Sequence, residues 1–253
     1  MKTLAAVAAI IFLAAANAPA ETTKVLSDAE IQGRDLVRKL LDQQPAENYT
    51  NAGVLKIHEG KGARWEIPIE CQTVVTTTNW QTIYKAIWTN KVETLWVVHA
   101  ANQPNAYAHD TYYLAGSIPV QGHLFRGPQP LTDAEIMAPF AHSDFWVTDL
   151  GLEFFHWSGQ RILPNPTTLK LGRSYTLLES TNPNPSANGY SRVLSWIDKE
   201  TGGILEAEAY DASGNKLKSF YPKAFKKDQL ESMEMDNDLT GSRTRLEFDL
   251  PAK

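Results

Sequence analysis

The sequence predicts a mainly β protein with a few helices (α+β), in which antiparallel strands form a curved sheet and an apolar helical segment lies against its concave face. Short runs of β-branched and aromatic residues, separated by Gly, Asn and Asp, follow one another through most of the chain and are typical of antiparallel strands. The segment from Phe140 to Trp157, FAHSDFWVTDLGLEFFHW, is called the plug here. It is too aromatic to stay in water and too short to cover itself, so it needs a sheet to receive it.

Residues 1–20 are typical of a secretory signal peptide. A single lysine precedes an apolar run from Leu4 to Ala16, and small residues stand at Ala18 and Ala20. A membrane anchor is the weaker interpretation, because the run is shorter than the roughly 20 residues that span a bilayer. We expect cleavage after Ala20, a periplasmic or secreted protein, and one domain formed by residues 21–253.

Charge and cysteine content limit the classes of partner and the source of stability. The formal net charge is −5 at pH 7, which argues against nucleic acid or an anionic membrane surface as the main partner, since both bind basic patches. The single cysteine, Cys71, cannot form an internal disulfide, so an apolar core must stabilise the fold. The length of 253 residues fits one all-β domain.

The first predicted helix begins at a capping box, in which Ser27 and Glu30 satisfy each other's backbone N–H groups. Pro45, just past Gln44, should end it. Its apolar stripe consists of Leu36, Val37, Leu40 and Leu41.

Strands are predicted between Ala52 and Val98, with turns at Gly60 to Gly62 and at Asn90. Pro68 lacks the N–H that a central ladder needs, and so we expect a bulge or a sheet edge at this position.

The stretch from 100 to 130 is rich in Asn, Pro, Gly and His, around two short predicted strands, 110–116 and 118–125. Thr132 and Glu135 form a second capping box, which should open a short helix through Met137.

Within the plug, Thr148 or Asp149 is expected to start a helix that runs from Leu150 to Trp157. Such a helix would be apolar on nearly all sides.

Strands follow the plug in the order of a meander, with hairpin turns at Glu200 to Gly203 and at Asp211 to Asn215. The run from Arg243 to Leu250 alternates most cleanly, with charged residues on one face. The other face is formed by Thr244, Leu246, Phe248 and Leu250.

One segment matches the spacing of a calcium-binding EF-hand loop, from Asp236 to a Glu247 at the twelfth place. Its fifth place is Thr240 and its eighth is Arg243, and both flanks have the pattern of strands rather than helices. We therefore expect a hairpin turn and no metal site.

Catalytic motifs are weak in this sequence. The six histidines are scattered without the spacing of zinc ligands. Ser158 lacks the G-x-S-x-G frame of a hydrolase, and the pairs His109-Asp110 and Ser143-Asp144 could meet only through long-range folding. No phosphate-binding glycine motif occurs, and so neither a catalytic residue nor a cofactor is predicted.

A set of motifs resembles the LolA-like outer-membrane lipoprotein-sorting proteins, over about Phe140 to Phe248. These motifs are Tyr190-x-x-Val193-x-x-Trp196-Ile197-Asp198, Gly203-Ile204-Leu205, Tyr210-Asp211-x-x-Gly214, Met233-Glu234-Met235 and Thr240-Gly241-Ser242-Arg243-Thr244, with Asp149-Leu150 and Trp157 upstream.

The resemblance implies an unclosed antiparallel β-barrel, a half-barrel, with helices covering its concave apolar face and a cavity between them that holds acyl chains. It also implies a carrier of lipoproteins, with an inner-membrane donor and an outer-membrane acceptor, although a free lipid is an equal candidate for the cargo. We expect a monomer. We expect the cavity and its lid to be formed by Trp65, Trp88, Trp96, Phe145, Trp146, Leu150, Phe154, Phe155, Trp157, Val193, Trp196 and Tyr210.

The leading hypothesis is a periplasmic carrier that shields acyl chains and moves them towards the outer membrane without covalent chemistry. The alternative is a sensor or structural binding module on the same scaffold, in which the plug never leaves the sheet and the tryptophans are ordinary core. A secreted hydrolase is the third class, and it lacks a recognisable nucleophile.

Overall fold

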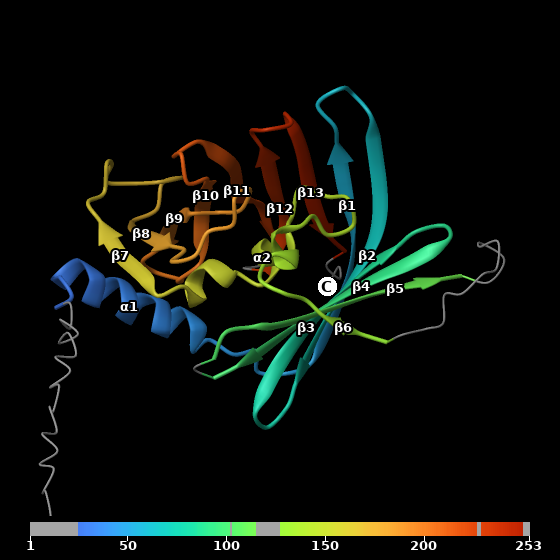
Figure 1. Cartoon of the computed structure of the whole chain (residues 1–253), viewed down its shortest axis with the longest axis horizontal. Coiled ribbons are helices and arrows are strands. Elements are labelled where there is room, and N and C mark those ends of the chain that lie inside the picture. Colours follow the sequence, from blue (N-terminus) through green and yellow to red (C-terminus); the bar gives the residue numbers. More distant parts are fainter. Residues whose placement is uncertain (1–24, 102, 115–126, 227–228, 250–253) are drawn as a thin grey trace, which may run out of the picture.

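The structure is a computed structural model that describes residues 25–101, 103–114, 127–226 and 229–249, with only the backbone of Lys226. Within these residues, thirteen strands form one antiparallel sheet that does not close (Figure 1). Strands β6 and β7 lie at its two ends, and the order is β6-β5-β4-β3-β2-β1-β13-β12-β11-β10-β9-β8-β7. The predicted class, a mainly β half-barrel with a few helices, is confirmed.

The sheet consists of two meanders. The first contains β1 (Tyr49–His58), β2 (Arg64–Val75), β3 (Asn79–Ile87), β4 (Lys91–Ala100), β5 (Ala106–Tyr113) and β6 (Gln129–Pro130). The second contains β7 (Gly159–Leu163), β8 (Tyr175–Thr181), β9 (Arg192–Asp198), β10 (Ile204–Tyr210), β11 (Lys216–Lys226), β12 (Gln229–Asn237) and β13 (Ser242–Phe248).

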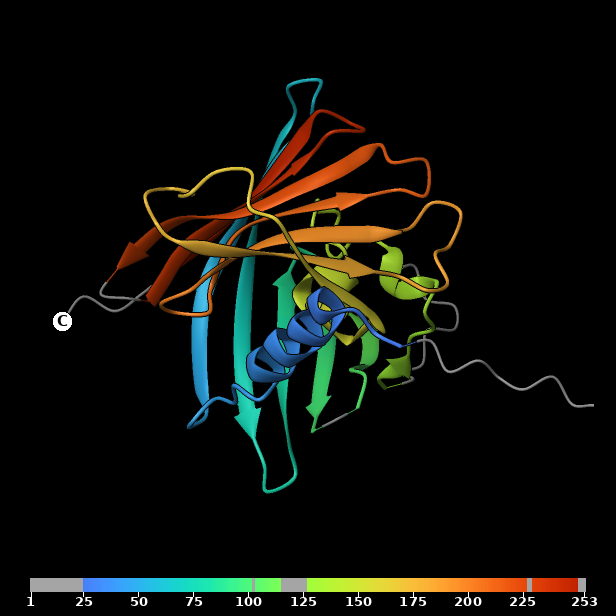
Figure 2. The same cartoon turned by 90° about the vertical axis from the view of Figure 1, so that its left-hand side faces the viewer.

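Strands β1 and β13 join the two meanders, with Gly53 opposite Phe248 and Ile57 opposite Thr244. A Cβ at Gly53 would lie only 2.3 Å from the carbonyl oxygen of Glu247, so this position requires glycine. Figure 2 shows that the two groups of strands run in different directions, so that the sheet wraps around a space on one side. The first helix lies in that space.

Helix α1 (Asp28–Leu41) begins as expected, since Glu30 N–H donates to Ser27 Oγ and Ser27 N–H donates to the Glu30 carboxylate. It ends at Leu41, three residues before Gln44, with Asp42 as its C-cap. The helix packs against β7 through Gly33, where a Cβ would lie 2.6 Å from backbone atoms of Arg161. A helix and a strand can approach this closely only because Gly33 has no side chain.

The plug lies against the concave face, but its local structure differs from the prediction. Helix α2 spans Val147–Leu150, and a 3₁₀ turn, η2, spans Glu153–His156. Asp149 does not start a helix at Leu150. Its Oδ2 instead accepts from the backbone N–H of Trp146 at 2.8 Å, so the helix begins earlier. Leu152 then adopts a left-handed φ of 49°, which ends the helical path before Trp157.

The stretch before the plug is partly as expected. Thr132 Oγ1 and N–H both donate to the Glu135 carboxylate, and the helix that follows is a 3₁₀ turn, η1 (Glu135–Met137). Strand β5 begins at Ala106, four residues before the predicted start, because it extends the ladder along β4. The predicted strand 118–125 lies outside the described residues.

Other sequence-based predictions are confirmed. Pro68 is opposite Val54 on β1, whereas the ladder to β3 starts only at Ile69, so Pro68 has an edge position on that side. The turns contain Gly202 and Gly214 with φ of 73° and 84°.

The EF-hand-like segment is a β12–β13 hairpin. The Asp236 and Glu247 carboxylates contact Arg243 and Lys56 respectively, rather than converging on one point.

Candidate ligand-binding chamber

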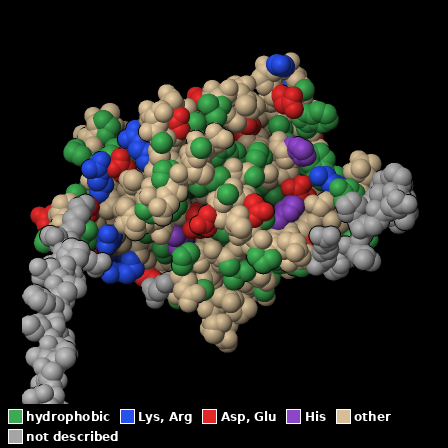
Figure 3. Space-filling view, in the orientation of Figure 1, with side chains coloured by type: hydrophobic (Ala, Val, Ile, Leu, Met, Phe, Trp, Pro, Cys, Tyr) green, Lys and Arg blue, Asp and Glu red, His purple; other side chains and the backbone are tan. Residues whose placement is uncertain are grey.

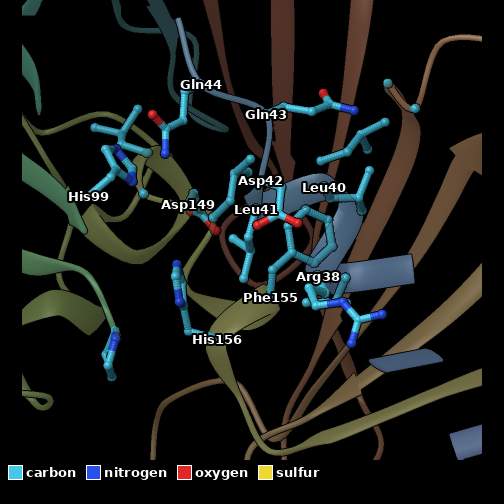
Figure 4. Close-up of a pocket in the computed structure, with 18 of the residues that line it drawn as sticks. Arg38, Leu40, Leu41, Asp42, Gln43, Gln44, His99, Asp149, Phe155 and His156 are labelled. Carbon is cyan, nitrogen blue, oxygen red and sulfur yellow. The ribbon is translucent and has the colours of Figure 1, made fainter. Parts of the chain in front are cut away.

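A cavity of about 830 Å³, here called the chamber, lies between α1, the plug and the concave face of the sheet. Its size is within the range of small-molecule sites. Figure 4 shows side chains from α1, from the segment that follows it and from the plug directed into this space. The apolar part of the lining is formed by Val37, Leu40, Leu41, Trp80, Tyr84, Phe145, Leu150, Leu152, Phe155, Trp157, Ile204, Phe220, Pro222, Phe225, Leu230 and Met233.

Strand alternation explains why the sheet presents an apolar surface to the chamber. On β4 the buried residues Leu95 and Val97 belong to the main core, and the same inward face continues at His99. On β3 the inward face carries Trp80 and Tyr84, and both line the chamber. Side chains two residues apart on a strand share one face, so whole rows of residues face the chamber together.

The plug is attached to β12 and β13 by a buried polar cluster around Asp144. Its carboxylate accepts hydrogen bonds from Ser242 Oγ at 2.6 Å, Thr244 Oγ1 at 2.9 Å and Asn237 Nδ2 at 3.0 Å. Its backbone N–H donates to Thr244 Oγ1 at 2.9 Å. A carboxylate with this many donors is held firmly, because every bond would have to be exchanged for water on release.

A second attachment is formed by Lys218 on β11, whose side chain is 1% exposed. Its Nζ donates to the carbonyl oxygen of Asp144 at 2.6 Å, and lies 3.7 Å from Asp149 Oδ2 and 3.8 Å from the centre of the Trp146 ring. The Trp146 ring stacks on Tyr190, at 4.7 Å between ring centres, and the Tyr190 hydroxyl donates to Asp149 Oδ2.

Burial governs the protonation of this pair. It lowers the pKa of Lys218 to about 8, against the attraction of Asp149 and Asp144. It also raises the pKa of Asp149 above its ordinary value, although Lys218 lies nearby. Both shifts reflect the cost of burying charge, and the attraction between Lys218 and Asp149 opposes both shifts.

The structure brings four of the predicted cavity residues into the chamber lining: Phe145, Leu150, Phe155 and Trp157. Phe154 and Val193 instead line a much smaller void of about 20 Å³. Trp146 contacts Lys218 and Tyr190 and does not line the chamber.

The remaining predicted residues also lie away from the chamber. Trp96 and Trp196 alternate with inward residues on β4 and β9, so they belong to the outer face, where Trp196 packs with Tyr175 and Leu205. Tyr210 hydrogen-bonds to Glu208 beside it on β10. Trp65 is 53% exposed at the start of β2, and Trp88 packs edge-on against His142.

Several lining residues were missed by the sequence-based prediction, notably Trp80, Tyr84, His99, Phe220 and Met233. The period-2 pattern of β3 places Trp80 and Tyr84 on one face, and this signal was available. Nothing in the sequence shows that β11 and β12 curve over β3, because that relationship depends on the joined sheet.

Among the described residues, no group of three or more His, Cys, Asp or Glu side chains has an arrangement that could hold a metal ion. Ser143 Oγ donates to the carbonyl oxygen of Phe140 and the Asp144 carboxylate is used by β12 and β13, so this pair does not form a nucleophile and its base. In the part of the chain that the structure describes, no helix has the length and apolar character to cross a bilayer.

The fold and the chamber together define a class: an open antiparallel half-barrel whose concave face, with a covering helix and a buried plug, encloses an apolar cavity. Comparison with known proteins finds the same architecture. A family model described as an uncharacterized protein matches residues 126–251. None of the curated proteins matches the chain by sequence.

Three solved structures are similar. A DUF1329 family protein from Desulfovibrio piger has a TM-score of 0.67 at 16% identity, over 90% of this chain and 96% of its own. A domain named for outer membrane lipoprotein sorting, from Vibrio parahaemolyticus, has a TM-score of 0.67 at 16% identity, over 87% and 92%. A LolA superfamily protein from Nitrosomonas europaea has a TM-score of 0.52 at 15% identity, over 89% and 96%. The resemblance to LolA-like proteins is confirmed, and at these identities it establishes the fold.

Proposed function

We propose that this protein is an acyl-chain carrier, which binds the acyl part of a lipoprotein or lipid in the chamber without covalent chemistry. The observation that carries the proposal is the chamber itself, about 830 Å³ of space lined mainly by apolar side chains. A solid core is close-packed, so a cavity of this size between otherwise well-packed elements favours a ligand over a purely structural role.

The expected driving force is the transfer of methylene groups from water. Each buried CH₂ contributes about 0.8 kcal/mol, so one chain of ordinary length supplies enough free energy for reversible capture. Exposed Phe225, opposite Leu230 on the β11–β12 hairpin, extends the apolar surface outward at the chamber rim. An acyl chain could enter along this surface without leaving an apolar environment.

The contacts of the plug support α1 rather than the plug as the wall that moves. The plug is attached by Asp144 and the buried Lys218. Helix α1 packs on β7, shares an apolar cluster with the plug through Val37, and donates a hydrogen bond from Arg34 Nη2 to Ser158 O at 3.3 Å. An exposed hydrogen bond and apolar contacts, which an apolar ligand can replace, are released at lower cost than a buried ionic cluster. The segment from 42 to 48, between α1 and β1, would then act as the hinge.

We further propose that the carrier acts in the periplasm after export, and that it receives cargo from an inner-membrane donor and passes it to an outer-membrane acceptor. The names of the similar structures from Vibrio and Nitrosomonas support this placement. The predicted cleavage after Ala20 also supports it, although that position lies outside the described residues.

The alternative is a sensor or structural module with the same fold. The attached plug favours a fixed interior, but it does not fill the chamber. The carrier and the structural module differ in whether an acyl ligand enters the chamber.

The test measures the lipid content of the purified protein and its affinity for an acyl ligand. Mature protein is extracted with organic solvent for mass spectrometry, and the delipidated protein is titrated with an acyl fluorophore. Met233→Trp, which fills the chamber, should weaken binding at least tenfold. Trp96→Phe on the outer face should not change it. Absence of extracted lipid together with absence of fluorophore binding would overturn the carrier proposal in favour of the structural module.

A further inference from the structure

The chamber has two chemically different ends. Its lining on β11 and β12 is apolar, with Phe220, Phe225, Leu230 and Met233. Its lining near the end of β4 and the end of the plug includes His99 and His156. Strands β4 and β12 are separated in the sheet by β3, β2, β1 and β13, so these two ends are several strand spacings of about 4.8 Å apart along the curved surface.

His99 is held rigidly at its end of the chamber. Its ring stacks on Trp80, the residue opposite it on β3, with 3.7 Å between ring centres and an interplanar angle of 16°. Figure 4 shows His99 and His156 on one side of the cavity, with Leu40 and Arg38 on the other. A stacked, oriented imidazole is suited to making a directed hydrogen bond.

One ring nitrogen of His156 lacks a hydrogen-bond partner in the described part of the chain. Its Nε2 is buried and has no hydrogen-bond partner within the described part of the chain. Leaving a buried polar atom without a hydrogen-bond partner costs about 1–3 kcal/mol, and such atoms are uncommon in folded proteins. Because His156 lines the chamber, a polar atom of the bound cargo is a suitable partner.

The charge state of this end favours an uncharged group. Burial lowers the pKa of His99 to about 4, against a hydrogen bond with the Asn105 side chain that raises it, and burial also lowers the pKa of His156. Both rings are therefore neutral at pH 7, and a neutral imidazole has one donor and one acceptor nitrogen. The carboxylate of Asp42 also lines the chamber and would repel an anion.

The basic side chains of the lining, Arg34 and Arg38, lie on α1 and have partners within the protein. Arg38 pairs with Asp35 at 2.9 Å, and Arg34 donates to Ser158 O. Figure 3 shows Lys and Arg side chains gathered mainly on the left of the molecule, near α1, with acidic and His side chains nearer the middle of this face.

We infer that His99 and His156 hold the polar end of the cargo, and that this end is an uncharged hydrogen-bonding group such as the hydroxyl or ester of an acylglycerol. The inference rests on the proposed function and adds the orientation and headgroup class of the ligand. The acyl chain then points toward β11 and β12, and the two histidines determine specificity rather than capture.

The experiment measures displacement of an acyl fluorophore from the mature protein by monopalmitoylglycerol, by palmitoyl-lysophosphatidic acid and by hexadecane at pH 7. The wild type should bind monopalmitoylglycerol most tightly. His156→Leu, and His99→Phe, which keeps the stack on Trp80, should each weaken monopalmitoylglycerol binding about tenfold, the equivalent of one hydrogen bond. Hexadecane binding should be unchanged in both variants. Trp96→Phe, on the outer face of β4, is the matched control and should change the affinity for neither monopalmitoylglycerol nor hexadecane.

Tighter binding of the lysophosphatidic acid would overturn the inference, and so would variants that keep full affinity for monopalmitoylglycerol. In both cases hexadecane and fluorophore binding persist, so the carrier proposal stands. If no apolar ligand binds the wild type, the carrier proposal and this inference fail together.

Discussion

The Lys218 ammonium on β11 lies 3.7 Å from the Asp149 carboxylate in α2, and both side chains are almost completely buried. This contact joins the plug to the second meander across 69 residues of sequence. It is reinforced by the hydrogen bonds of Asp144 to β12 and β13, which bring the same segment to the same wall of the sheet. The plug therefore belongs to the framework of the chamber, and its attachments can be tested directly.

The first prediction concerns this pair. Lys218→Met and Asp149→Asn should each lower the free energy of unfolding by about 3–5 kcal/mol, since each leaves the other group buried without its partner. The loss of unfolding free energy in the double variant should be smaller than the sum of the losses in the two single variants. The difference, which is the coupling energy of the double-mutant cycle, should be about 0.5–3 kcal/mol. Urea unfolding of the four proteins provides the measurement. Strictly additive losses would show that the two charges do not depend on each other.

The second prediction is a pH dependence that arises from Glu153. Its Oε2 accepts from the Tyr107 hydroxyl at 2.8 Å, and burial raises its pKa to about 7 from an ordinary value of 4.5. The folded state therefore keeps a proton that the unfolded state releases between pH 4.5 and 7. The stabilisation is complete below pH 4.5 and is lost as the pH rises through 7.

Glu153→Gln should remove this contribution while keeping an oxygen that can accept from Tyr107. Unfolding free energies at pH 5 and pH 8 should differ more in the wild type than in the variant. Glu200→Gln is the control, because the Glu200 side chain is 85% exposed. An unchanged pH dependence in Glu153→Gln would contradict the assignment.

The third prediction concerns the contact between α1 and β7. Gly33→Ala places a methyl group about 2.6 Å from the backbone of Arg161, which is rigid and cannot move aside. We expect α1 to be displaced at a cost of about 1–3 kcal/mol, even though alanine is the better helix former by up to about 1 kcal/mol. Limited proteolysis should cut α1 faster, and an acyl fluorophore should enter the chamber faster.

Gln32→Ala is the matched control, because Gln32 is an exposed neighbour on the same helix. If Gly33→Ala left both proteolysis and fluorophore uptake at the wild-type rates, α1 would not be the movable wall of the chamber. Faster proteolysis with slower uptake would give the same conclusion, because the helix would then support the site rather than close it.

Local chemistry in the sequence determined most of the strands, the capping box of α1, the contact of Thr132 with Glu135, which forms only half of the second predicted box, and the hairpin glycines. These features depend on neighbouring residues only: Ser27 with Glu30, Thr132 with Glu135, and the positive φ of Gly202 and Gly214. Alternation also fixed which residues of β13 face inward, since Thr244 and Leu246 are buried and Arg243 is exposed. The aromatic plug was located correctly because its composition alone demands burial.

Tertiary structure decided the rest. The sequence does not reveal that β1 pairs with β13, because that pairing is set by the packing of residues nearly 200 positions apart. For the same reason Trp196 and Phe220, both apolar, end on opposite sides of the sheet, one on the outer face and one in the chamber. The path of the plug was also decided by distant groups: Asp144 and Asp149 bind β11, β12 and β13, and these contacts outweigh the helical tendency of the stretch from Leu150 to Trp157. The residue types determined which side chains had to be buried. The pairing of the two meanders determined where the chamber lies between them.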